Sequence, residues 1–208
     1  VHRGYPAVPG DTILAKRRFA KEHLDHLRKL LMFEPRGHYD MYGALLVEPS
    51  LPGADLAVLF MHNEGYSTMC GHATIALGRY AVDHGLVPRQ EPFTEVGLEC
   101  PCGLVKVRVE VKDGKSGGVS FESVPAFLLA EQVRVEVPGH GAVVADISYG
   151  GAFYALADAA QFGLDVRRSR VRNTDIASLD IHDRVNYSVK KSALKINEEK
   201  TIVKLKLT

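Results

Sequence analysis

Cys70 is the residue of this chain best placed to do chemistry. It stands in the run Met69-Cys70-Gly71-His72-Ala73, where a glycine-containing loop over residues 65–69 is expected to enter a helix over residues 71–84. The first N–H groups of a helix lack intrahelical acceptors and carry partial positive charge. Such groups lower the pKa of a thiol and also bind carboxylates. One helix end can therefore supply both a base and an anion site; the alternative is that Cys70 is a small buried core residue.

Two further pairs of residues are weaker candidates for a functional site. His23 and His26 stand three residues apart on an expected helix and can share a metal ion, but their charged neighbours favour solvated side chains. Arg36 and His38 belong to the run Glu-Pro-Arg-Gly-His and either shape a site or pack and form salt bridges. We predict no metal site from these residues.

Cys100 and Cys102 are the remaining cysteines, separated by Pro101. They are too close for an easy disulfide, and their spacing is wrong for zinc. We therefore expect both to be structural. An odd total of three cysteines favours a reducing compartment, and we predict a cytoplasmic location.

The elements expected before Cys70 are a helix and two strands. Ala20, Leu24, Leu27 and Leu31 recur at helical spacing and predict a helix with one apolar face, with Lys and Arg side chains mostly off that face. Strands are expected over 42–48 and 54–62. The helix over 71–84 has no formal charge in its first eight residues apart from His72, so we expect it to be buried nearly all round, with Gly85 as its stop.

The second half of the chain is rich in alternating patterns. Val105, Val107, Val109 and Val111 alternate with charged residues and predict a strand with one solvated face, followed by an Asp113-Gly114 hairpin turn. Further strands are expected over 119–124, 133–137, 142–149 and 152–156. The pair Gly150-Gly151 either bends a strand or contacts substrate. Strands in hairpins around helices predict the α+β class.

Composition and charge narrow the class of protein. The chain has 208 residues, 46% hydrophobic and 25% charged, which are globular values. No apolar run approaches the roughly 20 residues of a membrane-spanning helix, so we expect no membrane partner. Residues 166–208 are basic, but they lack aromatic interleaving and any recognition motif, which argues against nucleic-acid binding. We interpret them as a solvated helix and connector.

Several motifs resemble the proline racemase family in order and spacing. They are the runs Glu34–His38, Asp40–Gly43, Asn63–Tyr66, Met69–Thr74, Val124–Phe127, Val137–Gly139 and Asp146–Tyr154. The resemblance covers about residues 2–168. Within the family, His62–Tyr66 and Cys100–Val105 look most like the animal-type trans-3-hydroxy-L-proline dehydratases.

The resemblance implies a diaminopimelate-epimerase-like fold, in which each of two lobes wraps a mixed sheet around a central helix. Residues 1–168 would form the first lobe, with 71–84 as its central helix. Residues 169–208 would be a divergent basic tail or a remnant of the connection to a second lobe that is largely missing. The family segments expected before the first residue and in the second lobe are not recognised, so we expect a chain truncated at both ends.

The resemblance also implies a reaction. Cys70 matches the family's first catalytic cysteine, Gly71 and His72 match substrate-contacting positions, and no cofactor is implied. We expect dehydration of trans-3-hydroxy-L-proline to Δ1-pyrroline-2-carboxylate, with proline racemase or hydroxyproline 2-epimerase as the alternative. The partner would be this small-molecule substrate, with a homodimer as a further possibility. The 208 residues alone are expected to be inactive, and a non-catalytic binding module remains the second alternative.

Overall fold

The computed structural model describes residues 5–39, 41–137 and 141–163, and the backbone of residues 202–206. The chain divides into two compact units, unit 1 (Val1–Val124) and unit 2 (Pro125–Thr208). The lobe boundary expected near residue 168 and most of the basic tail lie outside the described residues, so that division stays a prediction.

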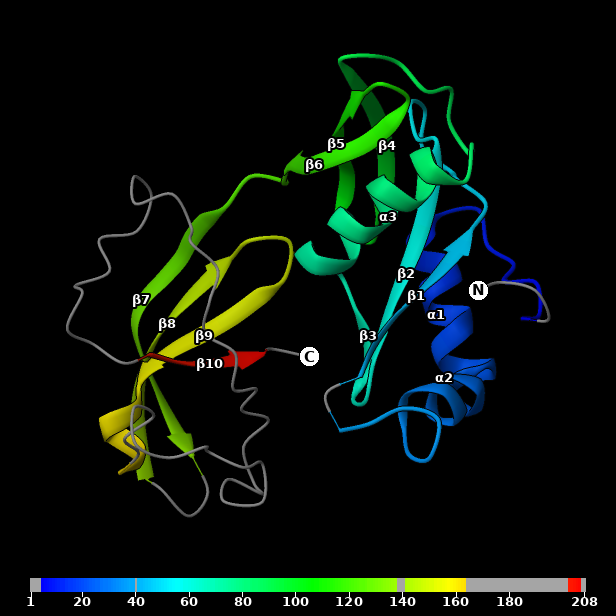
Figure 1. Ribbon diagram of the computed structural model, residues 1–208. Helices are drawn as coiled ribbons and strands as arrows, with labels where there is room; N and C mark the ends of the chain where they lie inside the picture. The colour runs from blue at the N-terminus through cyan, green and yellow to red at the C-terminus, as the bar shows by residue number, and fades with distance from the viewer. Residues whose placement is uncertain (1–4, 40, 138–140, 164–201, 207–208) are drawn as a thin grey trace. The chain divides into compact units, whose positions relative to one another are not determined.

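Unit 1 contains a mixed six-stranded sheet in the order β1-β2-β4-β5-β6, with β3 also paired to β2 (Figure 1). The strands are β1 (Tyr42–Val47), β2 (Leu56–His62), β3 (Gly65–Ser67), β4 (Phe93–Cys100), β5 (Gly103–Lys112) and β6 (Lys115–Glu122). β2 and β4 run parallel, at Leu56↔Leu98 and Ala57↔Glu99, whereas the other pairs of this sheet are antiparallel. The α+β class and a mixed sheet wrapped around a helix are confirmed.

Helix α3 (Gly71–Asp83) packs against β4, β5 and β6 and is the helix around which the sheet curls (Figure 1). Its sheet-facing side is buried at Thr74, Leu77, Gly78, Ala81 and Val82. The prediction of burial all round is wrong, because one side alone contacts the sheet and Ile75 on the other side is 42% exposed.

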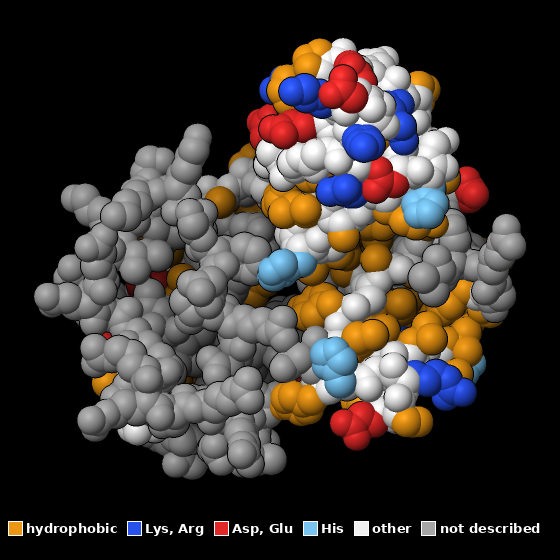
Figure 2. All heavy atoms as spheres, viewed as in Figure 1, with side chains coloured by type: hydrophobic (Ala, Val, Ile, Leu, Met, Phe, Trp, Pro, Cys, Tyr) orange, Lys and Arg blue, Asp and Glu red, His pale blue; other side chains and the backbone are white. Residues whose placement is uncertain are grey.

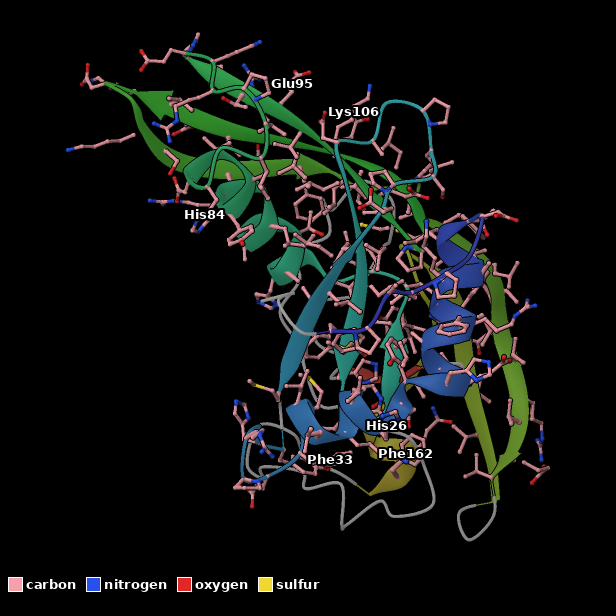
Figure 3. All side chains as sticks on the ribbon, turned by 90° about the vertical axis from the view of Figure 1, so that its right-hand side faces the viewer. His26, Phe33, His84, Glu95, Lys106 and Phe162 are labelled. Atoms are coloured by element: carbon pink, nitrogen blue, oxygen red, sulfur yellow. The ribbon has the colours of Figure 1, made fainter. Side chains whose placement is uncertain are left out.

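Gly85 stops helix α3, as the sequence predicted. Gly85 has a left-handed φ of 63°, and the N–H of Leu86 donates to the Ala81 carbonyl at 2.8 Å, which closes the last turn. His84 stands at this end of the helix, opposite the end that carries Cys70 (Figure 3).

The other face of the sheet is covered by two helices where the sequence predicted one. α1 (Ile13–His23) begins at Thr12, whose hydroxyl accepts from the Ala15 N–H at 3.2 Å. It ends at Leu24, whose φ of −120° and ψ of 10° are not helical, and α2 (Asp25–Met32) starts again at once. The break lets both short helices contact β2, since each presents its own apolar side.

Strand β2 is buried on both faces. Val58 and Phe60 belong to the core under α3, whereas Ala57, Leu59 and Met61 belong to the core under α1 and α2. A strand covered on both faces has a continuous apolar sequence, as the run Leu56–Met61 does.

The β5–β6 hairpin confirms the alternating pattern. Val105, Val107, Val109 and Val111 are buried and the residues between them are exposed. Asp113 and Gly114 both have positive φ in the turn, as a two-residue hairpin requires. Charged side chains gather over this end of unit 1 (Figure 2).

Unit 2 contains a four-stranded antiparallel sheet in the order β10-β9-β8-β7. Its elements are β7 (Phe127–Val137), β8 (Gly141–Tyr149), β9 (Phe153–Asp158), the 3₁₀ helix η1 (Ala159–Phe162) and β10 (Ile202–Lys206). Gly150 and Gly151 form the β8–β9 turn, in line with a strand bend, and Gly151 has a φ of 92°. β10 is a strand in the tail where a helix or connector was expected. No helix among the described residues is long and apolar enough to cross a membrane.

Candidate active site

Cys70 lies where the sequence predicted it, at the start of α3. It is the N-cap residue, with extended φ and ψ of −146° and 110°, and it is 8% exposed. Its carbonyl accepts from the Thr74 N–H at 3.0 Å and from the Thr74 hydroxyl at 2.8 Å. Gly71, the first helical residue, is buried, and His72, the second, is exposed. The first turn holds no acidic residue, so nothing in it opposes the positive end of the helix dipole.

The first three residues of the segment that leads to Cys70 are a strand where the sequence predicted a loop over residues 65–69, and residues 68–69 are a loop as predicted. Residues 65–67 form β3, which pairs with the end of β2 at Phe60↔Ser67 and His62↔Gly65. The expectation failed because three residues are too few for a periodic pattern. β3 returns the chain along β2 and delivers Cys70 to the core under α3.

Two arginines hold the backbone of this segment. Arg28, on α2, donates to the carbonyls of His62 and Asn63 at 2.6 Å each, and its guanidinium also binds the Asp25 carboxylate. Arg17, on α1, donates twice to the Tyr66 carbonyl, at 2.5 and 3.1 Å. The Arg28 charge holds the pKa of Asp25 below its ordinary value, chiefly through the hydrogen bond.

The last residues before the helix are held from other directions. The Ser67 hydroxyl donates to the Met69 carbonyl at 2.9 Å, and the Cys102 N–H donates to the Thr68 carbonyl at 3.1 Å. Asn63 bridges to the segment before β1, because its amide donates to the carbonyls of Met32 and His38 at 3.2 Å each.

Cys100 and Cys102 share the core under α3 with Cys70. None of the three forms a disulfide. The hydrogen bond between Cys100 and Cys102 raises the pKa of Cys100, and burial raises it further. The same bond lowers the pKa of Cys102, since Cys100 donates to the Cys102 thiolate. This pair therefore keeps the Cys100 thiol protonated beside the position of Cys70.

The other sequence candidates are not brought to this site. His23 and His26 lie on different helices because of the break at Leu24, and both are exposed; His26 projects from α2 (Figure 3). Arg36 and His38 are exposed, and the His38 carbonyl accepts a hydrogen bond from the Asn63 amide. Among the described residues no group of three metal-binding side chains occurs.

The sequence reasoning missed the arginine contacts. Arg28 and Arg17 were interpreted as cations off the apolar face, yet Arg28 is 3% exposed and Arg17 half-buried. A basic residue at a core-facing helical position was the available signal, because a long cationic side chain is buried only where acceptors meet it.

The family comparison gives a match over the whole chain. The sequence pattern described as "Proline racemase" matches residues 1–208, beyond the span 2–168 over which the motifs were recognised. The chain belongs to the proline racemase family.

The similar proteins include a dehydratase and an epimerase, two of the activities that the resemblance implied. The chain is 60% identical over 186 residues to a trans-L-3-hydroxyproline dehydratase of Saccoglossus kowalevskii. The aligned region covers 89% of this chain and 57% of that protein. It is 50% identical over 171 residues to a 3-hydroxyproline 2-epimerase of Burkholderia multivorans, covering 82% of this chain and 51% of that protein. The chain thus spans about half the length of the curated relatives it matches.

A solved family structure has the same fold. A hydroxyproline epimerase of Agrobacterium vitis, solved with bound trans-4-hydroxy-L-proline, matches with a TM-score of 0.69 and 31% sequence identity. The match covers 78% of this chain and 48% of that one. The curled α+β architecture described above is therefore that of proline racemase family members.

Proposed function

We propose that this chain is part of a trans-3-hydroxy-L-proline dehydratase that works without a cofactor, with Cys70 as the base. The observation that carries the proposal is a thiol at the N-terminus of a 13-residue helix, 8% exposed, in a chain 60% identical to a dehydratase. The 60% sequence identity supports the choice of substrate, and the position at the N-terminus of α3 supports Cys70 as the base. The proposed location is the cytoplasm.

The first step is removal of the α-proton. This proton is weakly acidic, so the charge that develops as it leaves must be stabilised. The N–H groups of Gly71 and His72 would bind the substrate carboxylate at the positive end of α3. The Cys70 thiolate takes the proton, and the electron pair of the broken C–H bond stays on Cα.

The second step is elimination of the 3-hydroxyl. The electron pair on Cα forms the Cα–C3 double bond while the C3–O bond breaks, and the hydroxyl leaves as water with one proton, which balances the proton that Cys70 took and gives up again to restore the thiolate. The resulting enamine tautomerises to Δ1-pyrroline-2-carboxylate. The sum is the loss of one water, with no change in oxidation state and no co-reactant.

The alternative function is epimerisation or racemisation, which the 50% identical epimerase favours. That reaction needs an acid on the opposite face of Cα to return a proton. Incubation of the full-length protein in D₂O with trans-3-hydroxy-L-proline separates the two. We expect Δ1-pyrroline-2-carboxylate; recovery of the intact hydroxyproline with deuterium at Cα would assign the epimerase, and L-proline that loses optical activity would assign the racemase.

Cys70→Ser in the full-length protein tests the base. We expect turnover to disappear while the thermal unfolding curve is kept, because a serine hydroxyl stays protonated at neutral pH. Cys102→Ser is the matched control and should keep turnover, since its backbone N–H still reaches Thr68. A Cys70→Ser protein with even a tenth of wild-type turnover would exclude Cys70 as the base.

Residues 1–208 by themselves are expected to be inactive. The proposed reaction holds the carboxylate from two helix N-termini, and α3 supplies one of them. Removal of one preorganised donor typically costs about 10²–10³ in rate. Purified 1–208 protein that turns over near the full-length rate would contradict this; weak substrate binding without turnover would favour a binding module, alone or as a homodimer.

A further inference from the structure

Six backbone carbonyls between His62 and Cys70 accept hydrogen bonds from groups outside the β2–β3 ladder. Their donors are Arg28 (to residues 62 and 63), Arg17 (to 66), the Cys102 N–H (to 68), Ser67 (to 69) and the Thr74 hydroxyl (to 70). Ordinary loops leave such carbonyls to water. In this segment six of the nine backbone carbonyls are instead bound by protein donors.

The two arginines act on the part of the segment that has least support of its own. β3 has three residues and pairs with β2 alone, and a strand pair this short is marginal in water. Gly65, at the start of β3, has a φ of 149°, and a Cβ built on it would have no neighbour within 4 Å, so side-chain packing does not restrain this position. The turn is therefore held by the donors to its carbonyls, together with the Asn63 amide and the hydrogen bond from the Glu64 N–H to His62 Nδ1.

Arg28 has the geometry for this role. Its guanidinium is planar, and its donors serve the Asp25 carboxylate on one side and two consecutive carbonyls on the other. A single lysine ammonium cannot span these acceptors, because its three donors radiate from one atom. Arg17 reaches the same segment from a different helix, so α1 and α2 each provide one anchor.

We propose that Arg28 and Arg17 are positioning residues for Cys70. They fix residues 62–66, and the fixed backbone sets where the chain enters α3, hence how the Cys70 thiol lies against the first helical N–H groups. A displacement of about 1 Å at a catalytic group can cost about 10²-fold in rate. The inference rests on the proposed function only where turnover is the readout.

The experiment compares four variants of the full-length protein: Arg28→Met, Arg28→Lys, Arg17→Met and Glu99→Gln. Glu99→Gln is the stability control, because it breaks a buried charged contact on the same face of the sheet without touching residues 62–70. Three quantities are measured: thermal unfolding, kcat and KM for trans-3-hydroxy-L-proline, and the pH dependence of iodoacetamide alkylation at the Cys70 peptide, read by mass spectrometry.

We expect the midpoint of the Cys70 alkylation profile to shift to higher pH in Arg28→Met and to shift less in Arg17→Met, because the thiolate would lose its alignment with the first N–H groups of α3. kcat should fall about 10- to 100-fold in Arg28→Met. Arg28→Lys should recover part of each effect. Glu99→Gln should lower the unfolding temperature and leave the midpoint and kcat at wild-type values.

The proposal is overturned if Arg28→Met changes the midpoint and kcat no more than Glu99→Gln does, or if Arg28→Lys restores both fully, since charge alone would then suffice. If Arg28→Met does not fold, Arg17→Met decides by the same criterion. A wild-type protein without turnover would refute the proposed function, whereas the alkylation profiles would still test the positioning role.

Discussion

Strand β2 separates two cores of different chemistry. Toward α3 it presents Val58 and Phe60 to a cluster made of valines, alanine, leucine and thiols. Toward α1 and α2 its apolar residues share the interior with the charged side chains of Lys16, Arg28 and, from β4, Glu99. The first core packs against α3, the helix that carries Cys70. In the second core, buried charged side chains bind the backbone of the connections between strands.

The difference shows how the two cores divide their tasks. Apolar packing is non-directional, and its free energy depends on how completely side-chain volume fills the core. Charged groups buried with several hydrogen bonds accept one arrangement, because an unpaired partner is costly. Lys16 illustrates this, since its ammonium is buried and donates to the Glu48 carbonyl at 2.8 Å. The stability of the α3 core should therefore depend on side-chain volume, and the stability of the α1–α2 side should depend on charge and pH.

Phe60→Ala should have the largest effect on stability. The side chain is fully buried in the α3 core, and such truncations cost about 3–5 kcal/mol of the free energy of unfolding. Urea unfolding followed by circular dichroism measures the loss, which should be the same at pH 5 and pH 7. The exposed Leu51→Ala is the control, with an expected change within about 0.5 kcal/mol. A loss below about 1 kcal/mol would show that the α3 core is loosely packed.

Glu99→Gln should have the next largest effect, and it should depend on pH. Burial raises the pKa of Glu99, but the hydrogen bonds from Ser50 and Leu51, aided by the Lys16 charge, outweigh burial and hold the pKa below its ordinary value. A lowered pKa stabilises the fold above the unfolded-state pKa of about 4.3, and this stabilisation is lost as the pH falls through the folded value.

The loss in Glu99→Gln is expected to be about 2 kcal/mol at pH 7, because the new amide group faces the donors of Ser50 and Leu51. The difference from wild type should shrink as the pH is lowered from about 5 toward 3. Urea unfolding across this range is the measurement. A difference that stays constant with pH would mean that the pKa of Glu99 is the same in the folded and unfolded states, and a difference that grows as the pH falls would mean that the folded state raises it.

Gly78→Ala should have a smaller effect on the free energy of unfolding, and whether it stabilises or destabilises reports how closely α3 packs on the sheet. At an exposed helical position this change stabilises by about 1 kcal/mol. A Cβ at Gly78 would instead lie 2.4 Å from Cγ1 of Val107, a stiff side chain in the α3 core, so we expect a loss of about 1 kcal/mol. Val107→Ala in the Gly78→Ala background should relieve the clash, with a coupling energy of at least about 1 kcal/mol. Additive effects would place α3 farther from β5.

The smallest expected effect concerns the thiols at the edge of the α3 core. Because Cys100 donates to Cys102 and lowers its pKa, Cys102 should be alkylated by iodoacetamide at neutral pH before Cys100, which is fully buried with a raised pKa. Cys100→Ala should slow the alkylation of Cys102 by raising its pKa. Peptide mapping over time measures both rates, and equal rates would show that the hydrogen bond is absent in solution.

The sequence predicted the α3 core better than the opposite side. The alternating valines of β5, the Asp113-Gly114 turn and the stop at Gly85 are local patterns, and each was found where expected. Cys70 was placed correctly at a helix N-terminus for the same reason. Its catalytic role, and those of Gly71 and His72, stay predictions.

The contacts on the α1–α2 side could not be predicted, because they join residues far apart in sequence. Arg28 and the His62 carbonyl are 34 residues apart, so a basic residue at a core-facing helical position signals burial but does not identify the carbonyls that it will meet. The helix break at Leu24 was missed because the apolar spacing runs through it unchanged. Composition likewise could not reveal the division at Val124, which depends on strand pairing.

The β1–β2 connection has a consequence for protein engineering. Leu51 is exposed, and a turn of this kind is the usual choice for an inserted tag or for new termini. Here the connection lies against β4: Glu99 binds the backbone at Ser50 and Leu51, and a Cβ on Gly97 would lie 2.1 Å from the Gly53 carbonyl. An insertion between Ser50 and Gly53 would displace the Leu51 N–H from the buried Glu99 carboxylate and disturb the connection that holds the two Ser50 donors in place. The exposed turn is thus a poor site for tags or circular permutation.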